Sequence, residues 1–157
     1  MSKLIQALLS GLFFTFILDF FIFLGIKLHY IDFYEINLYY NILFADNQNI
    51  FIYMFFTVLI GWLVIYVNSN KIKITIISLF FILSFSTLIA PIGHSVAKIV
   101  LMEENQVFNT KRHTFQGDIY YNGRDTISFY DYELEKIIIL NKKELIQKWK
   151  LKWNYHQ

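Results

Sequence analysis

Three long apolar stretches occupy residues 4–26, 50–67 and 74–90 of this chain and constrain its fold more than any other feature. A bilayer core about 30 Å thick takes about 20 helical residues to cross, and these stretches measure about 23, 18 and 17 residues. Asp19 is the only charged residue inside them. The pattern predicts a membrane α-helical fold with three transmembrane helices.

The composition agrees with this prediction and excludes several functional classes. Hydrophobic residues make up 56% of the 157 residues and aromatic residues 20%, more than a soluble domain of this size usually carries. The chain has no cysteine, which excludes disulfides, thiolate catalysis and cysteine metal sites. Its net charge of +2 is too small to indicate a nucleic-acid partner. The abundance of Ile, Asn, Lys, Phe and Tyr favours an AT-rich bacterial genome.

The charges in the short connections predict the topology. The loop 68–73 carries Lys71 and Lys73 and no acid, and Lys3 lies near the N-terminus. Because cytoplasmic loops are enriched in lysine and arginine, both segments are expected in the cytoplasm. We therefore expect a multi-pass protein of the bacterial inner membrane, with a cytoplasmic N-terminus and a periplasmic or extracellular C-terminal module.

Two domains are expected. Residues 1–104 form the three-span membrane domain, with an outer interfacial loop at 27–49 and a kinked exit at 91–104 that begins at Pro91. Tyrosines in the outer loop suit a short helix on the membrane surface. Residues 105–157 form a small extramembrane α+β module.

The C-terminal module is expected to be a β-meander closed by a helix. Asn122-Gly123 is typical of a type I′ hairpin turn. After Asn141, a pattern resembling a capping box predicts a helix toward the end of the chain. The expected strands are Thr114–Tyr121, Arg124–Tyr130 and Lys136–Leu140.

The end of the chain interleaves lysines with tryptophans. Tryptophan favours the headgroup layer and lysine attracts anionic lipid, so this segment suits a membrane surface. A solvated helix whose tryptophans pack on the meander explains it equally well. The residues of this membrane-surface site are Lys148, Trp149, Lys150, Lys152 and Trp153.

Small residues recur at helical spacing in the apolar stretches and predict close helix packing. Side chains four positions apart share one helix face, and small residues on that face let membrane helices approach closely. The expected packing positions are Ala7, Gly11, Gly61 and Ala90.

Asp19 ends the row that Ala7 and Gly11 begin, and several hydroxyls fall at a similar expected depth. An acid inside a membrane helix is costly and is expected to face protein or water. We expect an intramembrane polar cluster of Asp19 with Thr15, Thr57, Ser84, Ser86 and Thr87. Three interpretations of Asp19 stay open: a protonated carboxyl bonded within the bundle, a contact with another subunit, or proton or cation handling.

No enzyme or cofactor is indicated. The four histidines are scattered without metal-ligand spacing, and no nucleophile motif or phosphate-binding loop is present. We expect a non-enzymatic small membrane subunit or assembly factor of a larger bacterial inner-membrane complex. Its expected partners are the lipid bilayer and either other membrane subunits or further copies of itself. The alternatives are a proton- or ion-coupled transport component centred on Asp19 and an immunity-type membrane protein that acts against a toxin.

Overall fold

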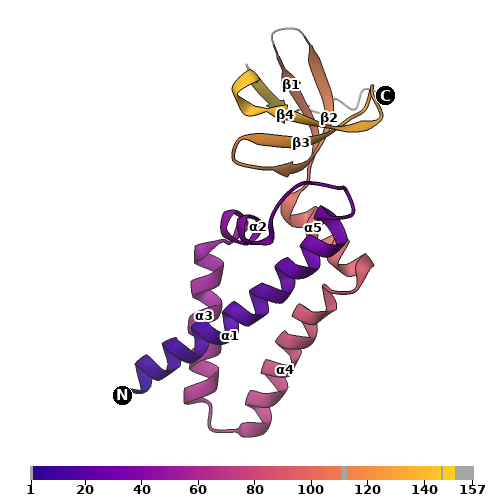
Figure 1. Cartoon of the computed structure of the whole chain (residues 1–157). Coiled ribbons are helices and arrows are strands. Elements are labelled where there is room, and N and C mark those ends of the chain that lie inside the picture. Colours follow the sequence, from indigo (N-terminus) through magenta and orange to yellow (C-terminus); the bar gives the residue numbers. More distant parts are fainter. Residues whose placement is uncertain (1, 111–112, 146, 151–157) are drawn as a thin grey trace, which may run out of the picture. The chain divides into compact units, whose positions relative to one another are not determined.

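The computed structural model describes residues 2–110, 113–145 and 147–150. They are mostly helical, with an antiparallel sheet in the C-terminal part (Figure 1). The chain divides into two compact units, Met1–Val96 and Ala97–Gln157. We call them the helical unit and the sheet unit and describe each by itself.

Three helices of the helical unit begin with a capping side chain. The side chains of Ser2, Asn49 and Ser69 accept hydrogen bonds from the first turns of α1, α3 and α4, which satisfies amides that the helix itself leaves unpaired. The first turns of α5 also belong to this unit. The elements are α1 (Lys3–Ile26), the π-helical turn η1 (Lys27–Ile31), α2 (Tyr40–Asn47), α3 (Ile50–Tyr66), α4 (Asn70–Ser86) and α5 (Ala90–Leu101).

Within the described residues, the helix Lys3–Ile31 is the one that is long and apolar enough to cross a membrane alone. The other candidates are two bent pairs, α2 with α3 and α4 with α5, whose axes turn by 86° and 89°. The expected apolar helices therefore exist, but the second and third reach spanning length only when each pair counts as one span.

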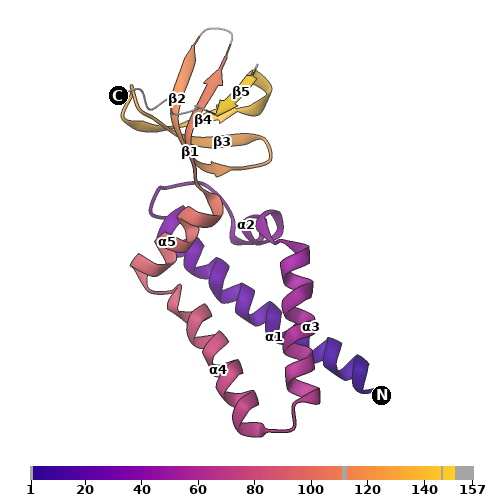
Figure 2. The ribbon, with the colours of Figure 1, turned by 180° about the vertical axis from the view of Figure 1, so that it is seen from behind.

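Helix α1 is the centre of the helical unit. It packs against both α3 and α4, which contact each other little. Figures 1 and 2 show α1 running obliquely across these two helices, which are joined by a short loop at one end. The outward faces of all three carry large apolar side chains, including Phe51, which is 83% exposed, and Ile82, which is 64% exposed.

The third apolar stretch breaks earlier than its sequence suggests. The expected span over 74–90 ends as α4 at Ser86, and α5 begins at Ala90 with Pro91 in its first turn. Proline suits the first turn of a helix because its missing amide would be unpaired there anyway. The Thr87 hydroxyl also donates to the Ser84 carbonyl at 2.7 Å, which closes the end of α4. The kink that was expected at Pro91 therefore lies at residues 87–89, just before the proline.

The sheet unit holds a five-stranded antiparallel sheet in the order β4-β3-β2-β1-β5. Its core consists of Phe108, Ile119, Ile127, Phe129 and Leu140. The rings of Phe108 and Phe129 meet edge to face at 5.2 Å. The strands are β1 (Glu103–Asn109), β2 (Thr114–Asn122), β3 (Thr126–Asp131), β4 (Lys136–Asn141) and β5 (Gln147–Lys150).

The expected closing helix is wrong. Asn141 caps only a 3-10 turn, η2 (Lys142–Glu144), and Gln147–Lys150 is a strand that pairs with β1. The physical reason lies in the sequence 148–153, where polar and apolar residues alternate with period two, as in a strand. Lys152 and Trp153 lie outside the described residues. Strand β1 itself was also missed by the sequence-based prediction.

The sheet must curl. Strands β4 and β5 lie at its two ends, yet only residues 142–146 connect them. In a flat sheet with strands about 4.8 Å apart, these two strands would be about 19 Å apart. Six steps of chain, half of them in a 3-10 turn, reach about 16 Å. The sheet therefore bends so that its two end strands approach each other.

The expected hairpin forms, but its turn differs from the expected type. A type I′ turn needs positive φ at both central residues, and neither Asn122 nor Gly123 has it. Instead the Gly123 amide donates to the Thr126 carbonyl at 3.0 Å, and β3 begins at Thr126 rather than at Arg124. A β-bulge between Ile119 and Tyr121 shifts the register of β2 against β3.

Candidate functional site

The closest contact between α1 and α3 is made by small residues. A Cβ atom on Gly11 would overlap the carbonyl oxygen of Thr57, and one on Gly61 would overlap the carbonyl oxygen of Ala7. The two backbones therefore touch, which only small side chains permit. The structure brings three of the expected packing positions, Ala7, Gly11 and Gly61, into this one crossing.

Helices α1 and α4 are joined by hydroxyl groups. Ser84 Oγ donates to the Leu18 carbonyl at 2.5 Å, and Thr87 Oγ1 donates to the Phe21 carbonyl at 3.1 Å. Both hydroxyl-bearing residues are buried. Gly25 lies so close that a Cβ there would collide with Thr87. These side chains bind the main chain of α1 and tie the end of α4 to it.

Asp19 has a partner that the sequence did not indicate. Its carboxylate Oδ2 accepts a hydrogen bond from Gln48 Nε2 at 2.9 Å. Gln48 lies in the bend between α2 and α3. The half-buried carboxylate is also within electrostatic range of the Tyr40 and Tyr53 hydroxyls, which donate to carbonyls of α1. Asp19 thus fastens the α2–α3 bend to α1.

The expected polar cluster around Asp19 is not a single cluster. Thr57 lies opposite Gly11, two turns of α1 away from Asp19. The buried hydroxyls of Thr15 and Thr57 have no hydrogen-bond partner within the described structure, and Ser86 donates to the Leu83 carbonyl of its own helix. Ser84 and Thr87 reach α1 at Leu18 and Phe21, on either side of Asp19, so the expected depth fits these two hydroxyls, whereas Thr57 packs nearer the start of α1.

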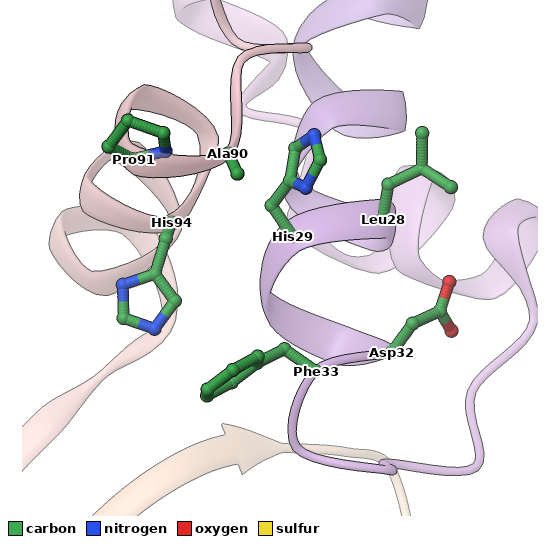
Figure 3. Close-up of a pocket in the computed structure, with 7 residues that line it drawn as sticks. All are labelled: Leu28, His29, Asp32, Phe33, Ala90, Pro91 and His94. Atoms are coloured by element: carbon green, nitrogen blue, oxygen red, sulfur yellow. The ribbon is translucent and has the colours of Figure 1, made fainter.

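A pocket of about 530 Å³ lies between η1 and the start of α5. Figure 3 shows the His29 ring standing in the gap between the two elements, with the Phe33 ring below it and the His94 ring opposite. Asp32 forms an ion pair with Lys27. The residues that line the pocket are Leu28, His29, Asp32, Phe33, Ala90, Pro91 and His94.

Both histidines of this pocket are held in place. His29 Nε2 lies 2.7 Å from the Leu88 carbonyl, and His94 Nε2 lies 3.2 Å from the Tyr34 hydroxyl. The His94 ring also contacts the rings of Tyr30, Phe33 and Tyr34, with centroids 5.5, 5.5 and 5.7 Å away. Sequence reasoning missed the pair because His29 and His94 are 65 positions apart. The available signal was the joint occurrence of His94 after Pro91 and of a tyrosine-rich segment after His29.

The other residues that were expected to form sites lie in different parts of the structure. Ala90 is exposed and lines the pocket rather than a helix crossing. Lys148, Trp149 and Lys150 lie on β5. In the described part of the chain, no three His, Cys, Asp or Glu side chains are grouped closely enough to hold a metal ion.

Comparison with known proteins adds no identification. No family model matches the sequence, and the searches of curated proteins and of solved structures found no match.

Proposed function

We propose that this chain is a small non-enzymatic integral membrane protein that serves as a subunit or assembly factor of a larger bacterial inner-membrane complex. One observation carries the proposal: the outward faces of α1, α3 and α4 are covered with large exposed apolar side chains. Examples on the three helices are Phe13, Phe55 and Leu79, each more than half exposed. Water-exposed faces of this extent are rare in soluble monomers, so lipid or other membrane helices are the expected surroundings.

Together with α1, the two bent pairs can supply three spans in which α3 and α4 are the crossing parts and the bent ends complete each span at the membrane surface. Helices α3 and α4 have 17 residues each and are about 26 Å long, slightly less than a bilayer core of about 30 Å. Helix α1 is longer and runs obliquely, which is how a long helix is accommodated. In this arrangement α2 and the start of α5 lie at the membrane surface.

The charged loops support one orientation. Lys71 and Lys73 lie at the start of α4 beside the α3–α4 loop, whereas Asp32, Glu35 and Asp46 lie in the connection between α1 and α3. Positive residues favour the cytoplasmic side. We therefore propose a cytoplasmic N-terminus and a sheet unit on the periplasmic or extracellular side. A reporter fused after residue 157 tests this: cytoplasmic reporter activity would contradict it.

The contacts of Asp19 favour a structural role for this residue over a role in transport. Its carboxylate is bonded to Gln48 of the same chain, and the Ser84 and Thr87 hydroxyls are bonded to carbonyls. An ion pathway would need a continuous row of polar groups, and these groups are already used to hold helices together. The outward faces remain as the surfaces for other subunits.

The experiment is affinity purification of the tagged full chain in mild detergent, with identification of the proteins that copurify. We expect a defined set of membrane proteins in a fixed ratio. Asp19→Asn preserves hydrogen bonding, and we expect this variant to copurify with the same proteins. Asp19→Leu loses the hydrogen bond to Gln48, and we expect it to lose the copurifying proteins. A chain that purifies alone from membranes with every detergent would contradict the subunit proposal. A flux of protons or cations lost in Asp19→Asn with normal assembly would favour transport instead.

A further inference from the structure

We propose that the pocket between η1 and α5 binds the phosphate-bearing headgroup of a membrane phospholipid. This inference rests on the proposed membrane location, but it requires no partner protein. It assigns a ligand class to His29 and His94, which their contacts with the Leu88 carbonyl and the Tyr34 hydroxyl hold beside the pocket.

The lining of the pocket is amphipathic. Leu28, Phe33, Ala90 and Pro91 supply apolar surface, while His29 and His94 supply imidazoles (Figure 3). Its volume of about 530 Å³ falls in the range of small-molecule sites. A ligand that fits both parts carries a polar head joined to an apolar chain. Free phosphate would leave the apolar part unused, which is why we infer a lipid.

The hydrogen bonds of His29 determine its role toward a ligand. The Leu88 carbonyl can only accept, so the nitrogen 2.7 Å from it, Nε2, carries the hydrogen. Nδ1 is then the nitrogen left to meet a ligand. An imidazole nitrogen at this place can form a hydrogen bond with the phosphate or hydroxyl groups of a headgroup.

The charges around the pocket suit a phosphate. Asp32 is the acidic residue of the lining, and its carboxylate is ion-paired with the Lys27 ammonium. The pair is neutral as a whole, so its carboxylate does not add a net negative charge beside the two imidazoles. His94 is held by the ring contacts of Tyr30, Phe33 and Tyr34, which fixes its position before a ligand arrives.

The place of the pocket along the chain fits a headgroup. The first apolar stretch ends at Ile26, and Lys27, His29 and Asp32 follow within two turns. Such a change from apolar to charged residues marks the layer where headgroups lie. A metal ion is a poor alternative, because in the described residues no suitable group of three ligands exists.

The test measures lipid bound to the purified full chain in detergent by native mass spectrometry, with dioctanoyl phosphatidylglycerol as the probe. Dioctanoylglycerol has the same tails without phosphate, and glycerol phosphate has the head without tails. We expect the phospholipid to bind and both comparison compounds to bind about tenfold more weakly or worse. Equal binding of dioctanoylglycerol would overturn the phosphate assignment, and equal binding of glycerol phosphate would overturn the lipid assignment.

Two kinds of variant locate the site. The double change His29→Gln with His94→Gln removes both imidazoles, while Gln at position 29 can still donate to the Leu88 carbonyl; we expect binding to fall about tenfold or more. Ala90→Leu adds volume to the lining while it keeps both histidines in the sequence, and it is expected to lower binding as well. His113→Gln in the sheet unit is the control. Unchanged binding in both pocket variants, each with an unchanged thermal unfolding profile, would overturn the proposal.

This result can be separated from the proposed function. Purification of the double histidine variant should still recover the partner proteins, because the outward helix faces are unchanged. If lipid binding behaves as expected but no partner copurifies, the subunit proposal fails alone. If partners copurify but the pocket variants bind lipid normally, the lipid inference fails alone.

Discussion

In the helical unit the helix crossings join glycines and hydroxyls to main-chain carbonyls while many large apolar side chains stay exposed, whereas in the sheet unit the core is a buried cluster of large apolar side chains. Gly11 and Gly61 form the α1–α3 crossing, and Phe108 and Phe129 form the centre of the sheet. Many large apolar residues of the helices, such as Phe51 and Ile82, are exposed instead. Water drives apolar groups together in the sheet unit. In the membrane location that we propose for the helical unit, lipid offers no such force, so close packing and hydrogen bonds would hold the helices.

The largest difference between the units should come from removing one aromatic ring. Phe129 is fully buried in the sheet unit, and Phe129→Ala is expected to lower its free energy of unfolding by about 3–5 kcal/mol. The matched variant Phe55→Ala removes a ring that is 61% exposed on α3 and should change little in a bilayer. Hydrogen exchange of each unit in nanodiscs measures both effects. Equal losses of stability in the two variants would contradict the proposed difference between the units.

Adding a larger side chain at the α1–α3 crossing should destabilise the helical unit, although removing an exposed ring from it should not. Gly11→Val forces a side chain against the Thr57 carbonyl and is expected to cost about 1–3 kcal/mol or more. The neighbouring Leu12→Val changes an outward-facing position and is its matched control. Unfolding by denaturing detergent, followed by circular dichroism, measures the difference. If Gly11→Val were as stable as Leu12→Val, the backbone contact between α1 and α3 would be disproved.

A single interhelical hydrogen bond should give a smaller effect. Ser84→Ala removes the bond from Ser84 Oγ to the Leu18 carbonyl and is expected to cost about 0.6–2 kcal/mol. Ser78→Ala on the same helix, at an exposed position, is the control and should be neutral. The same unfolding assay applies. A neutral Ser84→Ala would show that hydroxyl bonds do not hold α4 to α1.

The smallest expected effect is a pH dependence confined to the sheet unit. Burial, together with the hydrogen bond from the Tyr132 hydroxyl to Asp118 at 2.5 Å, raises the pKa of Tyr132 to about 12. The unfolded side chain has a pKa of about 10, so it loses its proton first. The stabilisation is complete below pH 10 and is lost as the pH rises toward 12. Tyr132→Phe should lack this component; identical stability profiles of the two proteins between pH 9 and 12 would contradict it.

The apolar helices were predictable because their signal is local. The stretches 4–26 and 50–67 agree with α1 and α3 to within one residue at each end. The strand expected at Lys136–Leu140 is confirmed as β4, one residue longer. The small residues Ala7, Gly11 and Gly61 also indicated the crossing face, since their spacing matches the helix repeat.

The rest depended on contacts between distant residues. Asp19 meets Gln48, and His29 meets Leu88 across 59 positions, and no local pattern encodes either pair. The last strand was misread because the pattern resembling a capping box at Asn141 suggested a helix, although residues 148–153 alternate as a strand does. Residues 147–150 form a strand in the structure because their backbone pairs with β1. A strand obtains its hydrogen bonds from another segment of the chain, and the local sequence does not show which segment that is.

The most direct test asks which medium covers the outward helix faces. The chain has no native cysteine, so single spin labels can be attached at Phe55→Cys on α3, at Ile82→Cys on α4, and at Ile139→Cys on the sheet, where the side chain is 70% exposed. In bilayers, collision rates with oxygen, which concentrates in lipid, and with a water-soluble nickel chelate are compared. The account predicts that oxygen dominates at positions 55 and 82 and that nickel dominates at position 139. Nickel access at positions 55 and 82 equal to that at 139 would contradict it.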